Sequence, residues 1–267
     1  MKSLSEINFN NIKTVGIRVD FNIPIDENFK ITDNTRILRA RDTIAFVKDQ
    51  NCKILLLSHF GRPKENYDEK FSFQTLIEQF SEVLDVKLNL LTYETFSKNG
   101  LSDFKNSNHQ ITLLENIRFF KGEIDNELTF SKLITDELDL YINEAFSASH
   151  RSHSSVYRMP KNITSVPGFN FEKEVLAIKE IKNSNKKKLA IIGGSKVSTK
   201  INTLLSLTNS CANIFIGGAM ANNFLKFKGI AVGSSLLEEG SEKMIKQIYA
   251  LAREKECEIH LPLDVVL

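Results

Sequence analysis

The chain has 267 residues, with 35 lysine and arginine residues against 33 aspartate and glutamate residues and a net charge of +2. This near balance excludes a strongly basic surface for nucleic acid or membrane, and the 42% hydrophobic and 25% charged content is typical of a globular protein. Cys52, Cys211 and Cys257 are too far apart for a zinc site or a disulfide framework. The sequence also shows no signal peptide and no membrane-spanning run. Together with the isolated cysteines, this favours a soluble protein of the reducing cytoplasm.

Short apolar segments in the first half of the chain predict strands that are buried on both faces. They lack the strict alternation of a half-exposed strand, and they lie at 15–19, 53–57, 86–91, 111–115 and 138–143. Segments 34–51 and 73–85 carry apolar residues at helical spacing. Alternating strands and helices are typical of an α/β domain with a parallel sheet.

A second series of elements begins after a predicted helix at 171–183 and the polar segment 183–188. Two apolar strands, at 189–192 and 213–216, are each followed by a Gly-Gly pair. Helical patterns run from Val197 to Asn209, from the second Gly-Gly pair to Phe227, and over 238–257, and a last strand is expected at 260–267.

These patterns predict an α/β protein of two Rossmann-like, three-layer, parallel-sheet domains joined by a hinge helix. We place the first domain at residues 1–170, the hinge at 171–185 and the second domain at 186–267. Only about eighty residues follow Leu189, which is less than a sheet covered on both faces usually needs. We therefore expect the second domain to be incomplete.

Basic residues follow several strands of the predicted first domain. Ligands of open α/β sheets bind beyond the carboxyl ends of the strands, which meet at one edge. Asp20, Phe21 and Asn22 follow the first strand, and Arg36 lies at the start of the next helix. The later strands are followed by His59, Arg62, Asn116, Arg118, His150, Arg151 and His153.

Arginines gathered on one rim repel one another unless an anion lies between them. The planar guanidinium binds phosphate and carboxylate groups through two hydrogen bonds, so the cluster predicts a site for a small anion that carries such groups. A histidine in such a site is a neutral hydrogen-bond donor or an acid–base catalyst, and the sequence leaves both open. For Asp20, Glu115 and Glu144, orienting the arginines is a sufficient role.

The second half contains a different anion-binding pattern. The segment IIGGSKVSTK combines a strand, two glycines and a predicted helix start, with Lys196 and Lys200 at helical i, i+4 spacing. It is not a P-loop, but IFIGGAMANNF repeats the strand–Gly–Gly–helix order. Each Gly-Gly pair alone indicates a tight turn, whereas the two pairs together with two lysines favour a nucleotide site.

Other kinds of site are disfavoured by the sequence. No Ser/His/Asp or Cys/His nucleophile set and no metal-ligand spacing is present. A dinucleotide-dependent enzyme of the Rossmann type is disfavoured because no GxGxxG follows the first strand.

Eight motifs occur in an order that resembles the phosphoglycerate kinase family. They extend over essentially the whole chain and read IRVDFNIP, ITDNTRI, LLLSHFGRPK, LLENIRFFKGE, NEAFSASHRSHSS, IIGGSKVSTKI, IGGAMANNFLK and LPLDVV. The resemblance implies an N-terminal domain for 3-phosphoglycerate or 1,3-bisphosphoglycerate and a C-terminal domain for Mg²⁺-ATP or Mg²⁺-ADP, with hinge closure between them. It implies a monomeric, cytoplasmic enzyme of glycolysis and gluconeogenesis.

The resemblance also implies roles for individual residues. The substrate-binding residues would be Asp20, Phe21, Asn22, Arg36, His59, Phe60, Gly61, Arg62, Arg118 and Arg151. The nucleotide-binding residues would be Gly194, Lys196, Lys200, Gly217 and Gly218. Arg36 and Lys196 would be catalytic, because a carboxylate nucleophile needs no general base and transfer depends on positioning and charge neutralisation.

Some positions depart from the family pattern. The family usually has Asp, Gly and Thr where this chain has Glu144, Ser147 and Ala148, and Gly where it has Ala219. Family members also continue through further strands, with loops for Mg²⁺-nucleotide and the transferring phosphate. Besides the kinase we therefore keep an alternative, a truncated protein that binds 3-phosphoglycerate with weakened nucleotide binding and impaired catalysis.

Overall fold

The computed structural model describes residues 2–63 and 67–264, which form two compact units, Met1–Ile178 and Lys179–Leu267. The division falls inside helix α8 (Phe169–Asn183), which lies close to the hinge helix predicted from the sequence. Within the described ranges, no helix combines the length and the apolar character needed to cross a bilayer.

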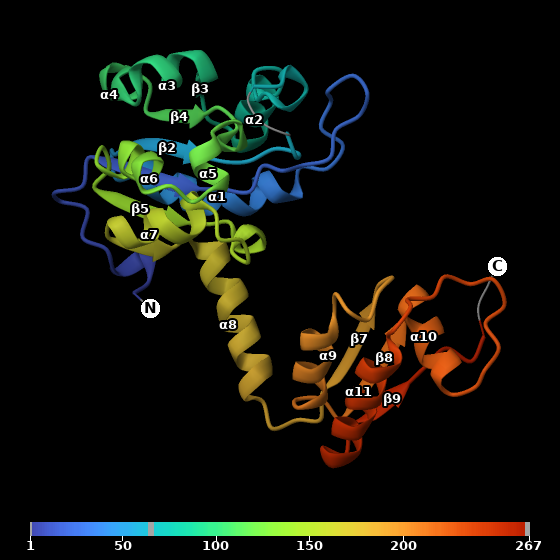
Figure 1. The fold of residues 1–267 in the computed structure, drawn as a ribbon. Helices are drawn as coiled ribbons and strands as arrows, with labels where there is room; N and C mark the ends of the chain where they lie inside the picture. Colours follow the sequence, from blue (N-terminus) through green and yellow to red (C-terminus); the bar gives the residue numbers. More distant parts are fainter. Residues whose placement is uncertain (1, 64–66, 265–267) are drawn as a thin grey trace. The chain divides into compact units, whose positions relative to one another are not determined.

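The first unit contains a six-stranded parallel sheet in the order β3-β4-β2-β1-β5-β6 (Figure 1). The sheet confirms the predicted α/β class. Its strands are β1 (Thr14–Arg18), β2 (Lys53–Leu57), β3 (Leu88–Leu91), β4 (Ile111–Leu114), β5 (Leu140–Asn143) and β6 (Ser165–Pro167). The sequence patterns located β1 to β5 to within a few residues and missed β6.

Helices cover both faces of this sheet, which explains the continuous apolar strands. In β2, Ile54 and Leu56 belong to one core, whereas Leu55 and Leu57 belong to the other. The first core is closed by α1 (Thr35–Lys48) and α2 (Ile77–Leu84). The second is closed by α3 (Tyr93–Asn99), α4 (Ser102–Asn106), α6 (Leu128–Thr135) and α7 (Met159–Asn162), and α5 (Lys121–Ile124) lies beside them.

The second unit contains a three-stranded parallel sheet in the order β7-β8-β9. Its elements are β7 (Leu189–Gly193), α9 (Ile201–Thr208), β8 (Asn213–Gly217), α10 (Ala219–Phe227), α11 (Glu242–Glu254) and β9 (Glu258–His260). The predicted last strand at 260–267 is therefore wrong in its position, because strand pairing ends at His260. Its final residues, 265–267, lie outside the described part of the chain.

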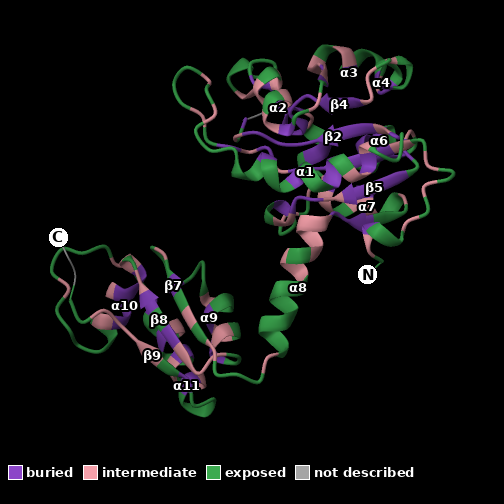
Figure 2. Ribbon diagram, turned by 180° about the vertical axis from the view of Figure 1, so that it is seen from behind, coloured by how far each residue is buried: buried purple, intermediate pink, exposed green. Residues whose placement is uncertain are grey.

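Only one face of the three-stranded sheet is covered by helices among the described residues. Ile192, Ile214 and Ile216 pack into a core with residues of α9, α10 and α11. The alternate side chains of Ile191 and Phe215 are 80% and 44% exposed. Figure 2 colours parts of β7 and β8 green, the colour of exposed residues. The expectation of a parallel sheet with incomplete cover is confirmed.

This one-sided core predicts unequal losses of stability when two adjacent isoleucines are truncated. Ile192→Ala removes a side chain that is 9% exposed, and we expect the free energy of unfolding to fall by about 2–4 kcal/mol. Ile191→Ala, on the open face, serves as the matched control and is expected to cost about 0.5 kcal/mol or less. Urea unfolding followed by circular dichroism measures both, and equal losses would contradict the one-sided core.

Candidate functional site

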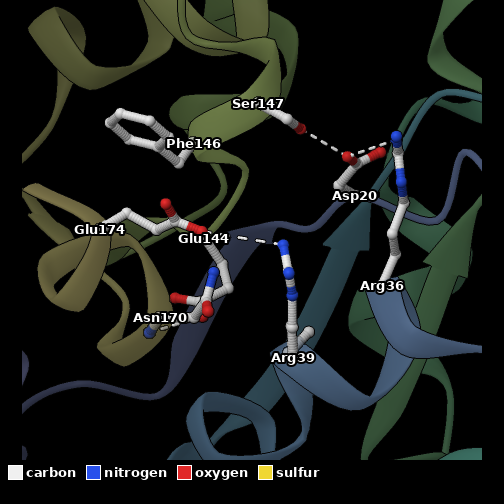
Figure 3. Close-up of a pocket in the computed structure, with 9 residues that line it drawn as sticks. Asp20, Arg36, Arg39, Glu144, Phe146, Ser147, Asn170 and Glu174 are labelled. Atoms are coloured by element: carbon white, nitrogen blue, oxygen red, sulfur yellow. Dashed lines mark hydrogen bonds and ion pairs between the residues drawn. The ribbon is translucent and has the colours of Figure 1, made fainter. Parts of the chain in front are cut away.

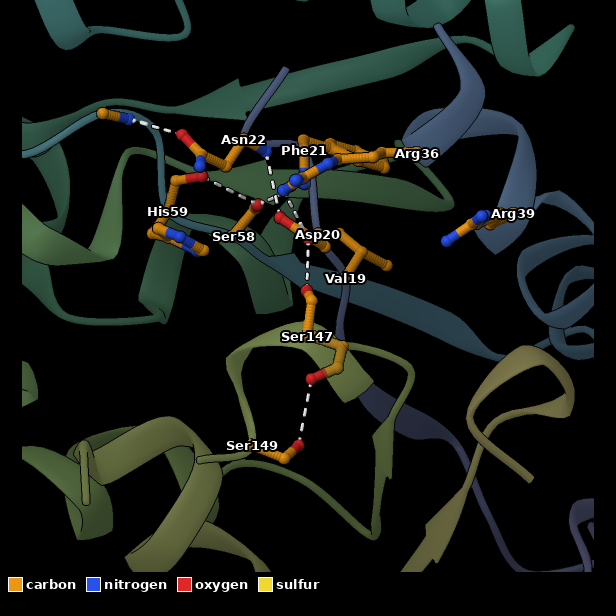
Figure 4. Close-up of polar contacts among 12 residues, drawn as sticks. Val19, Asp20, Phe21, Asn22, Arg36, Arg39, Ser58, His59, Ser147 and Ser149 are labelled. Carbon is orange, nitrogen blue, oxygen red and sulfur yellow. Dashed lines mark hydrogen bonds and ion pairs between the residues drawn. The ribbon is translucent and has the colours of Figure 1, made fainter. Parts of the chain in front are cut away.

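The predicted anion-binding residues lie at the carboxyl edge of the six-stranded sheet. Because β1, β2, β4 and β5 are parallel, the loops that follow them leave from the same edge. Figure 4 shows how the loop after β1, the loop after β2 and the segment after β5 converge around Asp20. The fold therefore brings together residues that are far apart in the sequence.

Asp20 connects the outer part of the site. Its Oδ2 accepts a hydrogen bond from the guanidinium of Arg36 at 2.9 Å and another from the Ser147 hydroxyl at 2.5 Å (Figure 3). Its Oδ1 accepts a hydrogen bond from the backbone N–H of Asn22 at 3.2 Å. Asp20 thus fixes Arg36, which would otherwise be a free cation in this part of the site.

The position of Arg36 follows from the way α1 begins. Asp33 accepts a hydrogen bond from the backbone N–H of Thr35 at 2.8 Å, and its contacts with Thr35 lower the pKa of the Asp33 carboxyl. The helix starts at Thr35, so Arg36 stands in its first turn. Its side chain remains nearly half exposed and can reach a ligand.

Two amide side chains shape the loop after β2. Asn22 accepts a hydrogen bond from the N–H of Gly61 at 2.8 Å, and Asn116 bonds both the N–H and the carbonyl of Phe60, at 3.2 and 2.7 Å. Gly61 has a φ of +60°, and a Cβ there would lie 2.3 Å from the ring of Phe71. Only glycine fits this turn, which presents the loop to the site.

Arg118 is the centre of an inner basic cluster, which also contains Arg62 and Arg151. It donates a hydrogen bond to the carbonyl of Gly61 at 2.5 Å. Burial lowers the pKa of Arg118 to about 10, with further lowering by the charges of Arg151, Arg18 and Arg62. Burial and the neighbouring arginines likewise lower the pKa of His153 to about 4. Positive charge is therefore concentrated here, and an anion would relieve it.

His59 is buried beside the inner cluster. Burial, followed by the charges of Arg18, Arg118 and Arg151, lowers the pKa of His59 far below its usual range. The ring is therefore neutral at physiological pH, so it can take part in hydrogen bonds but adds no positive charge. Of the two readings that the sequence left open, this environment favours the neutral hydrogen-bonding group.

Two predicted substrate-binding residues have side chains that belong to the core. Phe21 is fully buried and its ring lies 5.1 Å from that of Phe80. Phe60 packs against Phe71 and Phe73, with ring centroids 6.2 and 6.1 Å apart. Any contact that these two residues make with a ligand must therefore come from the backbone.

The sequence reasoning missed three buried polar residues below the cluster. Arg18, the last residue of β1, is only 2% exposed and donates hydrogen bonds to Ser155 at 2.9 Å and to His59 at 3.0 Å. Ser155 in turn bonds the carboxylate of buried Glu123 at 2.6 and 2.8 Å. The available signal was a charged residue inside an otherwise apolar strand, VGIRV.

Glu144, after β5, is buried against the start of α8. Its Oε1 accepts a hydrogen bond from the N–H of Asn170 at 2.9 Å, while its Oε2 has no partner in the described part of the chain. Burial raises the pKa of Glu144 to about 7, against the opposing effect of the Asn170 N–H. A Cβ at Gly168 would lie 1.5 Å from Oε2, so this carboxyl requires glycine there.

The second unit places Lys196 and Lys200 in a turn before α9. The prediction of both lysines on one helix is wrong, because α9 begins at Ile201 and Lys200 has φ −118° and ψ 0°. The Glu238 carboxylate holds the turn by accepting hydrogen bonds from the N–H groups of Val197 and Ser198, at 2.6 and 3.1 Å. The charge of Lys196 contributes to lowering the pKa of Glu238, after the hydrogen bonds from Ser198.

The two Gly-Gly turns contact each other. Gly218 has a φ of +64°, and a Cβ there would lie 2.9 Å from the carbonyl oxygen of Gly194. The N–H of Met220 donates to the same oxygen at 2.8 Å. The side chain of Lys200 runs beside Gly194, whereas Gly217 faces open space. Four of the five predicted nucleotide-binding residues therefore lie together, and Lys196 lies in the adjoining turn.

No group of three or more His, Cys, Asp or Glu side chains among residues 2–63 and 67–264 is arranged to hold a metal ion.

The chain resembles known proteins at the levels of family, sequence and structure. The family model described as phosphoglycerate kinase matches residues 4–267. A phosphoglycerate kinase of Prochlorococcus marinus (strain MIT 9312) is 41% identical over 270 residues, which cover 99% of this chain and 67% of that protein. One from Synechococcus elongatus is 38% identical over 257 residues, covering 96% of this chain and 64% of the relative.

Solved structures agree with the sequence comparison. The phosphoglycerate kinase of Coxiella burnetii superposes with a TM-score of 0.82 at 33% identity, over 98% of this chain and 66% of that one. The enzyme of Pyrococcus horikoshii gives 0.80 at 25% identity. The fold and site define an α/β protein with basic residues gathered at the carboxyl edge of a parallel sheet. The chain belongs to the phosphoglycerate kinase family and spans about two thirds of the length of these relatives.

The buried Glu144 predicts a specific pH dependence of stability. Between pH 4.5 and about 7 the folded chain keeps this proton and the unfolded chain loses it, so raising the pH lowers the free energy of unfolding. This rise in the pKa of Glu144 corresponds to about 3 kcal/mol in the free energy of unfolding. Glu144→Gln should lack this dependence and gain stability relative to the parent chain between pH 5 and pH 8.

Thermal unfolding of both chains across this pH range measures the difference. Glu174→Gln is the matched control. Glu174 and Glu144 line one pocket (Figure 3), but Glu174 is more exposed and its carboxylate lies 3.7 Å from the guanidinium of Arg39. Parallel pH profiles for the parent chain and Glu144→Gln would contradict the assignment.

Proposed function

We propose that the chain binds 3-phosphoglycerate at the carboxyl edge of the six-stranded sheet. The observation that carries this proposal is the inner cluster of Arg62, Arg118 and Arg151, in which the charges of Arg151 and Arg62 act on the buried guanidinium of Arg118. The nearby carboxylate of Glu123 is buried beneath the cluster and already accepts two hydrogen bonds from Ser155. A small ligand with phosphate and carboxylate groups would supply the missing negative charge.

The same proposal assigns the outer part of the site to the reacting end of the substrate. Arg36 is held by Asp20 and remains partly exposed, so an anion can compete for its guanidinium. The Ser147 hydroxyl would continue to satisfy Asp20 when Arg36 turns toward the ligand. Asn22 and the backbone of the Gly61 turn would complete the contacts.

The nucleotide part of the proposal concerns the second unit. Lys196, Lys200 and the paired turns at Gly194 and Gly218 would hold the phosphates of Mg²⁺-ATP or Mg²⁺-ADP, and Gly217 would face the base. The support is the close packing of the two glycine turns with Lys200 beside them. We propose that this unit serves reversible phosphoryl transfer between 1,3-bisphosphoglycerate and ADP, which gives 3-phosphoglycerate and ATP.

The proposed chemistry needs charge neutralisation rather than a base. The carboxylate of 3-phosphoglycerate is already ionised when it attacks the γ-phosphoryl group. Arg36 and Lys196 would neutralise the charge of the transferring group, and neutral His59 would donate a hydrogen bond without taking a proton. No residue of the site is required to change its protonation state.

A second candidate function is binding of 3-phosphoglycerate without phosphoryl transfer. It is favoured by the open face of the second sheet, where Ile191 and Phe215 are exposed beside Gly217 in an apolar groove. The first unit has no comparable exposed sheet face among its described residues. The monomeric state and the cytoplasmic location remain predictions from the sequence.

Binding of 3-phosphoglycerate is the first test, measured by isothermal titration calorimetry on the parent chain. Arg151→Ala removes one member of the inner cluster, and we expect the affinity to fall about 10- to 100-fold. Arg39→Ala is the matched control, because Arg39 lies near Glu174 at 3.7 Å, and it should leave the affinity within about twofold. Equal effects of the two substitutions would overturn the assignment of the cluster.

Phosphoryl transfer is tested separately, by a coupled assay with ATP and 3-phosphoglycerate. If the chain is a kinase, Arg36→Ala and Lys196→Ala should each lower kcat by about 10²–10³-fold, and Arg39→Ala should not. Binding of 3-phosphoglycerate with no activity above the Arg36→Ala background would instead select the second candidate.

A further inference from the structure

The hydrogen bonds around Arg18 have directions that the chemistry of the groups determines. A guanidinium has only donors, so Ser155 Oγ must accept from Arg18 Nε at 2.9 Å. The hydroxyl then has its own proton free to donate to Glu123 Oε1 at 2.6 Å. The backbone N–H of Ser155 donates to the other carboxylate oxygen at 2.8 Å. Glu123, Ser155 and Arg18 thus form a continuous buried chain of hydrogen bonds, which we call the relay.

The relay ends at His59 and determines where its ring carries a proton. Arg18 NH2 lies 3.0 Å from His59 Nδ1, and since the guanidinium can only donate, Nδ1 must be the acceptor. A neutral imidazole has one N–H, which is therefore on Nε2. Nε2 has no partner among the described residues, although it belongs to a residue in the substrate site.

We propose that Arg18, Ser155 and Glu123 are positioning residues that hold His59 in its Nε2–H tautomer, so that it presents a permanent hydrogen-bond donor to the bound anion. This goes beyond the proposed function, because the sequence assigned no role to these three residues. The part that concerns the ligand rests on the proposed 3-phosphoglycerate site, whereas the part that concerns the tautomer does not.

The relay is more than a way of satisfying buried groups. Arg18 brings a positive charge into the interior, which costs free energy unless a carboxylate balances it, and Glu123 supplies that balance through Ser155. Burial, followed by the positive charges of Arg18, Arg118 and Arg151, lowers the pKa of His59 and keeps its ring from binding a second proton. The ring therefore donates from the same atom throughout the physiological pH range.

The backbone around the relay is also fixed. Tyr141, fully buried in β5, donates its hydroxyl to the carbonyl of Ser155 at 2.6 Å. Arg18 NH1 donates to the neighbouring carbonyl of Val19. The bond from Tyr141 holds Ser155 against β5, and the bond to Val19 holds the Arg18 guanidinium at the end of β1. The guanidinium therefore has one orientation toward His59.

The experiment is long-range ¹H–¹⁵N NMR of the histidine rings in the full chain. The chain has five histidines, so His59 can be assigned by comparison with a His59→Gln variant. In the parent chain we expect only the Nε2–H tautomer from pH 5 to pH 8. Arg18→Gln offers both a donor and an acceptor to Nδ1, and it should populate the second tautomer or allow the ring to titrate.

Ser155→Ala provides a second variant if Arg18→Gln does not fold, and it should produce the same change to a smaller degree. Ser154→Ala is the matched control, because Ser154 is equally buried but its hydroxyl contacts the Glu127 carbonyl instead. An Nδ1–H tautomer in the parent chain would overturn the relay. So would an unchanged Nε2–H signal in Ser155→Ala together with Arg18→Gln, when the latter folds.

Calorimetry with 3-phosphoglycerate tests the ligand part. Variants with a disturbed tautomer should bind about tenfold more weakly, and Ser154→Ala should bind like the parent chain. Unchanged affinity with a mixed tautomer would overturn the role of His59 as donor. If the parent chain binds no 3-phosphoglycerate, the proposed function fails, while the NMR result still decides the relay.

Discussion

Mutual repulsion among arginines at one sheet edge is the constraint on which the first unit depends. The charges of Arg62 and Arg151 act on the guanidinium of Arg118, and Arg18 adds a further charge beneath it. The chain balances the buried charge internally with Glu123, whereas Arg62, Arg118 and Arg151 have no ion pair among the described residues. A parallel sheet can sustain this arrangement because its hydrogen-bonded strands hold the loops in place. In the proposed function, the ligand supplies the remaining negative charge.

The outer part of the site follows a different principle. Arg36 is neutralised by Asp20 before any ligand is present, and Ser147 shares the same carboxylate oxygen. An anion must therefore compete for Arg36, which links binding to a change in the partners of Asp20. Ser147 and Glu144 both differ from the usual family residues. Their positions, beside Asp20 and against the start of α8, show that the departures are concentrated in one segment after β5.

In the second unit, backbone contacts hold the two glycine turns together. Gly218 lies so close to the first turn that a Cβ there would be 2.9 Å from the carbonyl oxygen of Gly194, and Glu238 fixes the turn that contains Lys196. Its sheet is covered by helices on one face, and the other face exposes Ile191 and Phe215. This difference between the units is why binding and phosphoryl transfer are tested separately.

The sequence by itself determined the α/β class, five of the six strands of the first unit and the loops that carry the basic residues. These features depend on local patterns, namely continuous apolar segments and the residues that follow them. Tertiary structure alone decided that Arg18 is buried and linked to Ser155, which lies 137 residues away, and that Glu238 holds the Lys196 turn. It also decided that Lys200 precedes α9, which begins at Ile201 and not at Val197. Contacts between distant segments leave no periodic signal, because they depend on which side chains the finished fold brings within hydrogen-bond distance.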